Sequence, residues 1–156
     1  MSRPAIAQRY RLRLATWTVV REPGAPSPRV LNDPAAVVEL VRDFVRATDD
    51  DREHFWAILL NARHAYLMHV EVSVGTQSAS LVHPREVFGP ALREGAAAII
   101  VAHNHPSGDP TPSREDIDLT RKLAEAGKLL DVTVLDHVVI GNGTLQFVSM
   151  AGRGLV

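Results

Sequence analysis

The chain has 156 residues, which is enough for one domain with its own hydrophobic core. Hydrophobic residues make up 46% and charged residues 22%, and the net charge of −1 offers no electrostatic footprint for nucleic acid. There is no cysteine, which excludes disulfides, thiolate metal ligands and thiol nucleophiles, so any metal must bind imidazole and carboxylate groups. No apolar stretch approaches the roughly 18 residues of a membrane span, and the first ten residues do not resemble a signal peptide. We therefore expect a soluble, cytoplasmic protein without a membrane partner.

Residues 8–20 alternate between apolar and basic side chains, which predicts a half-buried strand. Tyr10, Leu12 and Leu14 face one way, and Arg9, Arg11 and Arg13 face the other. The arginines indicate a solvated, edge-protecting face, with a phosphate-binding stripe as the less favoured alternative. Residues 22–29 are rich in proline and are predicted to form a loop or linker. We therefore divide the chain into an N-terminal strand and linker, 1–33, and a main domain, 34–156.

The first predicted helix of the main domain begins at Pro34, with Asp33 as its N-cap, and ends near Ala47. Phe55–Leu60 and Tyr66–Val74 follow as two strands of a hairpin, and a short extended piece is expected near Ser80–Val82.

A second helix is predicted from Pro84 to a stop at Gly95, with Pro90 kinking or shortening it. Ala96–Ala102 is apolar on both faces, which is typical of a central, covered strand. A third helix is predicted from Ser113 to about Glu125, closed by Gly127. Two further strands, Val132–Ile140 and Thr144–Val148, are joined across a glycine-rich turn. The fold class is therefore α/β or α+β, with a mixed sheet flanked by helices.

The stretch from His103 to Asp116 carries the clearest chemical signal. His103 and His105 lie on the same side of an extended segment because side chains alternate across a strand, and Asn104 points to the opposite side. Ser113 and Asp116 have the spacing of a capping box at a helix start. Two imidazoles and a carboxylate can hold a divalent metal and leave a fourth position open, as in catalytic zinc sites. Asp116 as a simple helix cap is the alternative, but the joint pattern favours a metal site.

These motifs resemble a known family. His103-x-His105-Pro106 followed by Ser113-x-x-Asp116 is similar to the JAMM (MPN+) signature of zinc metallopeptidases. The longer pattern, with flanking segments 83–87 and 135–137, resembles the RadC-like branch and covers about residues 34–156. The resemblance implies a curved mixed sheet of JAB/MPN, or cytidine-deaminase-like, architecture.

The resemblance also implies a set of site residues. His103, His105 and Asp116 would bind one Zn²⁺ per chain, Ser113 would stabilise the developing oxyanion, and a glutamate before the first core strand would act as general base. Glu53 matches that position. Glu71 is the reserve candidate for the base, whereas Glu86 is expected on a helix surface.

The remaining histidines, His54, His64, His69 and His83, lack partners at ligand spacing and are expected in surface or turn positions. Asp136 and His137 lie mid-strand and point to opposite faces. A supporting role for one of them at the metal site and a plain core role are both open.

The expected function is hydrolysis of a peptide or isopeptide bond in a peptide or protein substrate. Full-length RadC proteins usually carry an additional helix-hairpin-helix region, which residues 1–33 do not resemble. The alternative function is a non-catalytic, metal-stabilised binding module associated with DNA repair or maintenance. Direct binding to nucleic acid receives no support from the charge balance. Homo-oligomerisation, through pairing of the N-terminal strand with a second subunit, is also left open.

Overall fold

A computed structural model of the chain describes residues 29–48, 51–75 and 82–156. The strand predicted at 8–20 lies outside these residues, as do most of the predicted linker and most of the extended piece near Ser80. The division of the chain at residue 33 therefore stays a prediction.

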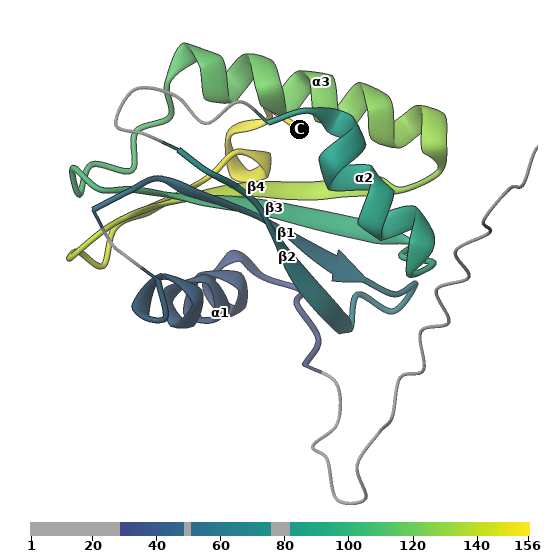
Figure 1. Ribbon diagram of the computed structural model, residues 1–156, viewed down its shortest axis with the longest axis horizontal. Coiled ribbons are helices and arrows are strands. Elements are labelled where there is room, and N and C mark those ends of the chain that lie inside the picture. The colour runs from purple at the N-terminus through teal and green to yellow at the C-terminus, as the bar shows by residue number, and fades with distance from the viewer. Residues whose placement is uncertain (1–28, 49–50, 76–81) are drawn as a thin grey trace, which may run out of the picture.

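The described residues form three layers, with a five-stranded sheet between helices (Figure 1). The strand order is β2-β1-β3-β4-β5; β3 and β4 are parallel, and the other neighbours are antiparallel. The α/β class with a mixed sheet and flanking helices is thus confirmed. The elements are α1 (Pro34–Arg46), β1 (His54–Leu60), β2 (Tyr66–Val74), α2 (Pro84–Arg93), β3 (Ala98–His105), α3 (Arg114–Leu130), β4 (Thr133–Gly141), β5 (Phe147–Ser149) and the short 3₁₀ turn η1 (Ala151–Arg153).

Side-chain alternation in the two central strands builds a hydrophobic core on each face of the sheet. Nearly every residue of β1 and β3 is buried, as expected for strands covered on both faces. One face packs against α1, and its core includes Val37, Val41, Phe44, Trp56, Ile58, Ile100 and Ala102. The other face packs against α2 and α3, and its core includes Phe55, Ala57, Val87, Phe88, Val101 and Leu123. Figure 1 shows α1 below the sheet and the other two helices above it.

The predicted helix starts are confirmed. Asp33 caps α1 by accepting a hydrogen bond from the backbone N–H of Ala36 at 2.9 Å, and Ser113 and Asp116 form the capping box of α3. Helix α2 begins at Pro84 and continues through Pro90 to Arg93, so the proline does not shorten it.

The predicted end of the third helix is wrong. Helix α3 continues past Glu125 to Leu130, and Asp131, with φ of 55°, ends it in the left-handed conformation. Gly127 lies inside the helix, where an added Cβ would stand 2.4 Å from the carbonyl oxygen of Val132. The glycine therefore serves the close approach of the α3–β4 connection rather than the helix end.

Strand β3 is longer than predicted and includes both His103 and His105. The β4–β5 hairpin is confirmed, and its turn packs closely against the loop that follows β3. An added Cβ at Gly141 would stand 1.9 Å from the carbonyl oxygen of Gly108. This contact ties the loop between β3 and α3 to the end of the sheet.

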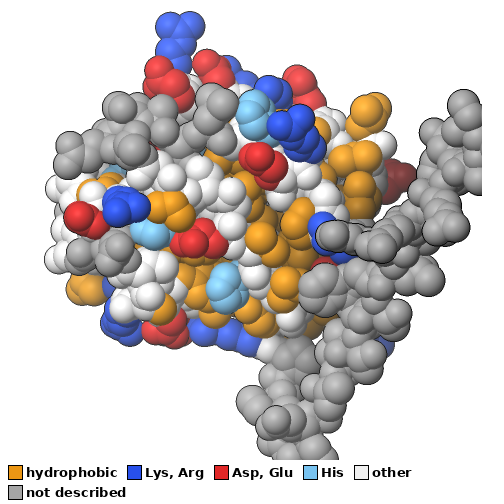
Figure 2. All heavy atoms as spheres, in the orientation of Figure 1, with side chains coloured by type: hydrophobic (Ala, Val, Ile, Leu, Met, Phe, Trp, Pro, Cys, Tyr) orange, Lys and Arg blue, Asp and Glu red, His pale blue; other side chains and the backbone are white. Residues whose placement is uncertain are grey.

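The face seen in Figure 2 carries hydrophobic side chains in its middle, with acidic, basic and histidine side chains interspersed around them. Charges of both signs are mixed on this face, in keeping with the net charge of −1. Within the described ranges, no helix is both long and apolar enough to cross a membrane.

Gly127→Ala tests the close contact at the α3–β4 connection. Alanine is the better helix former by about 1 kcal/mol, but its methyl group would collide with the Val132 carbonyl. We expect a net loss of about 1–3 kcal/mol in the free energy of unfolding, measured by denaturant titration. Gly89→Ala in α2 is the matched control, because nothing lies within 4 Å of its added Cβ. Equal midpoints for the two variants would contradict this account.

Candidate metal centre

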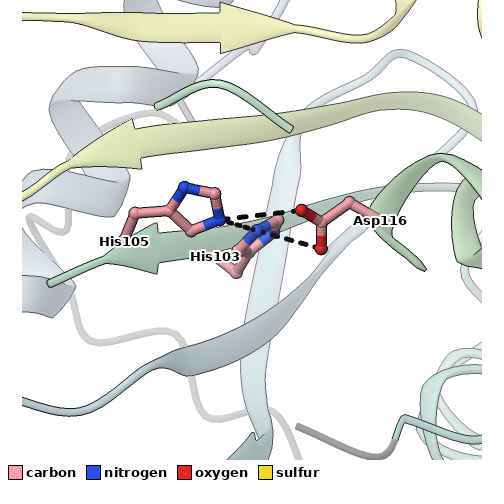
Figure 3. Close-up of side chains that lie close together, drawn as sticks. All are labelled: His103, His105 and Asp116. Atoms are coloured by element: carbon pink, nitrogen blue, oxygen red, sulfur yellow. Dashed lines mark hydrogen bonds and ion pairs between the residues drawn. The ribbon is translucent and has the colours of Figure 1, made fainter. Parts of the chain in front are cut away.

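His103 and His105 project from the end of β3 toward the helix α3 side of the sheet, and both rings point toward Asp116 (Figure 3). Strand β3 pairs with β1 as far as His103 and with β4 as far as His105, so ladders of hydrogen bonds hold both backbone positions. His103 is completely buried, whereas His105 is half-buried at the strand end.

Asp116 joins this pair from the first turn of α3. The backbone N–H of Ser113 donates to Asp116 Oδ2 at 2.7 Å, and the N–H of Asp116 donates to Ser113 Oγ at 3.1 Å. The same carboxylate faces the histidines, with Oδ1 at 3.3 Å from His103 Nε2 and Oδ2 at 3.6 Å from His105 Nε2. The helix cap and the contact with the histidines are therefore compatible, because the carboxylate has oxygens and lone pairs enough for both.

The three side chains could together hold a metal ion. The Nε2 atoms of His103 and His105 are 2.9 Å apart, and one ligand atom of each of the three residues lies within 4.8 Å of the others. Ligands at zinc distances of 2.0–2.1 Å in a tetrahedron are separated by about 3.3 Å. The imidazole nitrogens are 2.9 Å apart, and each lies 3.3 or 3.6 Å from an oxygen of Asp116, Oδ1 for His103 and Oδ2 for His105, so the separations are close to this value. The donor set therefore fits a small divalent metal ion.

Hydrogen bonding and charge make this a site for a positive group. His105 Nδ1 lies 2.8 Å from the carbonyl oxygen of Asp109, which can only accept, so His105 Nδ1 carries a proton. In the neutral ring, Nε2 then presents a lone pair to Asp116. The neighbouring carboxylate of Asp116, which favours the protonated ring, is the main cause that raises the pKa of His105. Burial alone would raise the pKa of Asp116, but the neighbouring imidazoles of His103 and His105 outweigh burial and lower that pKa far below its usual range.

Glu53 lies immediately before β1, close to the metal centre but outside the three-residue group. Phe55 pairs with His103, so the same register continued by two residues puts Glu53 opposite His105. Alternation from Phe55 directs its half-buried side chain toward the same face of the sheet. The negative charge of Glu53 also adds to the effect of Asp116 on the pKa of His105, which indicates proximity.

Asn104 holds the Glu53 segment in place, a role that the sequence analysis missed. Its side chain is completely buried on the opposite face of the sheet. The backbone N–H of His54 donates to Asn104 Oδ1 at 2.7 Å, and Asn104 Nδ2 donates to the carbonyl of Arg52 at 2.9 Å. The amide therefore holds both peptide groups that flank Glu53. The only sequence signal was a polar residue at a buried position of a central strand.

The other two glutamates weighed in the sequence analysis lie elsewhere. The carboxylate of Glu71, on β2, is 2.6 Å from His54 Nδ1. His54 in turn stacks on Trp56, which belongs to the core on the α1 face, so Glu71 is engaged away from the metal centre. Glu86 is exposed, as expected, and accepts a hydrogen bond from the backbone N–H of His83.

The prediction that the remaining histidines occupy surface or turn positions is partly wrong. His54 is buried and bonded to Glu71, and His69 stacks on Phe44 with ring centroids 3.8 Å apart. Both were misjudged because their partners lie on other elements. His64 does lie in the β1–β2 turn, and His83 is the N-cap of α2.

The structure distinguishes the roles of Asp136 and His137, which point to opposite faces of β4. Asp136 accepts hydrogen bonds from Ser149 Oγ and the backbone N–H of Ala151, and so holds the segment that follows β5.

His137 lies under the metal centre, with its Nε2 2.8 Å from His103 Nδ1. Burial lowers the pKa of His137 well below its ordinary value, which keeps the ring neutral. Its other nitrogen contacts the hydroxyl of Thr120, a residue that the sequence analysis missed.

Comparison with known proteins identifies the family. The family model of the RadC-like JAB domain matches residues 31–155. Similar proteins include a UPF0758 protein of Desulforamulus reducens, 49% identical over 127 residues, which are 81% of this chain and 54% of the relative. Another, from Moorella thermoacetica, is 48% identical over 144 residues, 92% of this chain and 58% of the relative. The chain spans about half the length of the curated relatives it matches. By this match over most of its length, the chain belongs to the RadC-like JAB domain family.

Proposed function

We propose that the protein is a zinc-dependent hydrolase that cleaves a peptide or isopeptide amide bond. The observation that carries this proposal is the convergence of three electron-pair donors, His103 Nε2, His105 Nε2 and Asp116, on one point beside Glu53. Such a group of donors in a half-buried position is stabilised by a cation. Membership of the JAB domain family, in which hydrolases are common, supports the same proposal.

Zinc is the proposed cofactor, one ion per chain, because two imidazoles and one carboxylate match its catalytic ligand sets and leave one position open. When bound, zinc lowers the pKa of a water molecule from about 15.7 to about 7 and polarises a carbonyl oxygen. The buried strand β3 holds two of the three ligands without rearrangement, which favours a site preorganised for the ion.

Glu53 is the proposed general base. It would take the proton of the attacking water and deliver it to the leaving amine, as a carboxylate within hydrogen-bond reach can do. Two features support this role: the β1–β3 register, which would put Glu53 opposite His105 if it continued by two residues, and the buried Asn104 amide, which holds the peptide groups on either side of Glu53. The fixed backbone would limit the positions that the carboxylate can reach.

Ser113 is the proposed hydrogen-bond donor to the oxyanion that forms on the substrate carbonyl. Its Oγ accepts the hydrogen bond from Asp116 N–H, which leaves its own O–H proton for another acceptor. The side chain is exposed beside Asp116, where a substrate carbonyl would approach. In other enzymes, one such donor contributes about 2.7–4 kcal/mol to transition-state stabilisation.

The proposed substrate is a peptide or protein in the cytoplasm. The alternative is a binding module of RadC type that works in DNA repair or maintenance and uses the metal only for stability. It is favoured by the family relationship alone. The two proposals share the metal ligands and differ at Glu53, because a module without catalysis has no task for a base there. Self-association would be compatible with either.

Metal analysis tests the site directly. Protein purified without added metal and then incubated with Zn²⁺ should retain about one equivalent after dialysis, and His103→Ala should retain much less because a buried ligand is lost. Mass spectrometry under native conditions and elemental analysis give the stoichiometry. His64→Asn is the control, since His64 lies in a turn with φ of 56°, a conformation that asparagine tolerates. Equal metal content in wild type and His103→Ala would refute the proposed centre.

Zinc binding should weaken as the pH falls. The pKa of His105 is raised above 6.5 by Asp116, so below that pKa a proton must leave Nε2 before the metal can bind. We expect the affinity to fall at least about tenfold per pH unit below the pKa of His105 and to level off above it. Calorimetry in buffers of different ionisation enthalpy counts the protons released. An affinity that is constant between about pH 5 and 8 would show that His105 is not a ligand.

Glu53→Gln separates catalysis from metal binding. The variant should keep about one zinc per chain and lose turnover at least about a hundredfold, because glutamine cannot accept the proton. Turnover is measured by incubating the zinc-loaded protein with a peptide library and with isopeptide-linked peptides, followed by mass spectrometry of new termini. Glu71→Gln is the control, since that carboxylate contacts His54 instead. Full activity of Glu53→Gln would mean that another group is the base, and no cleavage by wild type would favour the binding module.

A further inference from the structure

A chain of hydrogen bonds runs beneath the metal centre and joins two of its ligands on the side away from the ion. His103 Nδ1 lies 2.8 Å from His137 Nε2, and His137 Nδ1 lies 2.6 Å from Thr120 Oγ1. The Thr120 hydroxyl donates to the backbone carbonyl of Asp116 at 2.6 Å. His103, His137 and Thr120 are completely buried. This buried hydrogen-bond chain therefore links β3, β4 and the first turn of α3.

The direction of each hydrogen bond can be deduced by starting from the bond to the backbone carbonyl of Asp116. A carbonyl oxygen can only accept, so the single proton of the Thr120 hydroxyl must point to Asp116. If that proton pointed to His137 instead, two oxygens would face each other at 2.6 Å without a hydrogen between them. Thr120 Oγ1 therefore accepts from His137, and the proton of the imidazole lies on Nδ1.

The same reasoning carries through His137 to His103. His137 is completely buried, and its ring nitrogens contact a hydroxyl and another imidazole rather than a carboxylate. A charged ring there would be strongly disfavoured, so only one of its nitrogens carries a proton. Since that nitrogen is Nδ1, Nε2 of His137 is a bare acceptor. It must receive its hydrogen bond from His103 Nδ1–H, which leaves His103 Nε2 with a free lone pair.

We propose that Thr120 and His137 are positioning residues that fix His103 in the tautomer with its proton on Nδ1, so that its Nε2 lone pair faces the metal position. This inference rests on the proposed function in that it assigns the lone pair to a metal. His105 obtains the same tautomer from a single backbone acceptor, the carbonyl of Asp109. His103 lies deeper. His137 Nε2 accepts its Nδ1 proton, and Thr120 keeps that nitrogen free of a proton by accepting from the other nitrogen of His137.

Thr120→Val is the decisive variant. Valine keeps the shape of threonine but removes the oxygen that accepts from His137. The proton of His137 is then free to move to Nε2, from which it donates to His103 Nδ1. His103 must in turn carry its own proton on Nε2, where it blocks the metal. Loss of such an outer partner typically weakens metal binding about 10–100-fold. Thr120→Ser keeps the hydroxyl and should restore the wild-type behaviour.

The tautomers are measured in metal-free protein with ¹⁵N-labelled histidine, from long-range ¹H–¹⁵N correlation spectra at a pH where His103 is neutral. In wild type and Thr120→Ser we expect the proton of both His103 and His137 on Nδ1. In Thr120→Val we expect a substantial population with the proton of His103 on Nε2, and a zinc dissociation constant about 10–100-fold larger than that of wild type. Amide spectra show whether the variants are folded.

A wild-type His103 with its proton on Nε2 would overturn the inference, whether or not the variants fold. So would a folded Thr120→Val whose His103 tautomer and zinc affinity match those of wild type. Failure of the proposed function gives a different result. A wild-type protein that binds no zinc would refute that function, while the tautomer of His103 in metal-free protein would still decide for or against the buried hydrogen-bond chain.

Discussion

The pairing of β3 with β1 on one side and β4 on the other is the constraint on which the candidate metal centre depends. Because side chains alternate along a strand, this pairing directs His103 and His105 to one face and Asn104 to the other. The parallel partner β4 follows the same rule. His137 therefore meets His103 beneath the centre, while Asp136 on the opposite face holds the segment after β5.

Electrostatics explains why a positive group is favoured at the point where the three side chains meet. The carboxylate of Asp116 gains from nearby positive charge, and the two imidazoles direct lone pairs at the same point when neutral. Burying such acceptors together without a cation is unfavourable. In metal-free protein a proton on His105 supplies part of the compensation, which is why the pKa of this residue is raised. The backbone N–H of Ser113 supplies another part by donating a hydrogen bond to the carboxylate.

Local patterns in the sequence were sufficient to predict the parts of the site that lie within one segment. The capping box of α3, the hairpins and the mixed sheet were predicted correctly, and the His-x-His spacing placed two imidazoles on the same side of β3. The end of α3 was misplaced because Gly127 is required by a contact with Val132, which no helix-stop rule describes. His54 was misjudged for a similar reason, since its partner Glu71 is supplied by the neighbouring strand.

The contacts beneath the centre could not be predicted because they depend on register between distant strands. His137 reaches His103 only through the parallel pairing of β3 and β4, which contains an irregularity between Ile99 and Ile100. A shift of one residue would exchange His137 for a neighbour on the opposite face. Thr120 carries no sequence signal at all beyond its position one helical turn after Asp116.

The three letters His-Asn-His combine two tasks that the fold keeps on opposite faces of one strand. The histidines supply the proposed metal ligands, whereas the asparagine between them binds the peptide groups around Glu53. The proposed ligands and the proposed base come from elements far apart in the sequence, yet one buried amide on the strand that carries both histidines binds the peptide groups on either side of Glu53. A polar residue at this central position is unfavourable for packing unless both its donor and its acceptor are satisfied. Here the backbone of residues 52–54 satisfies both, so the cost of burying the amide is offset by the same contacts that hold the Glu53 segment beside the metal centre.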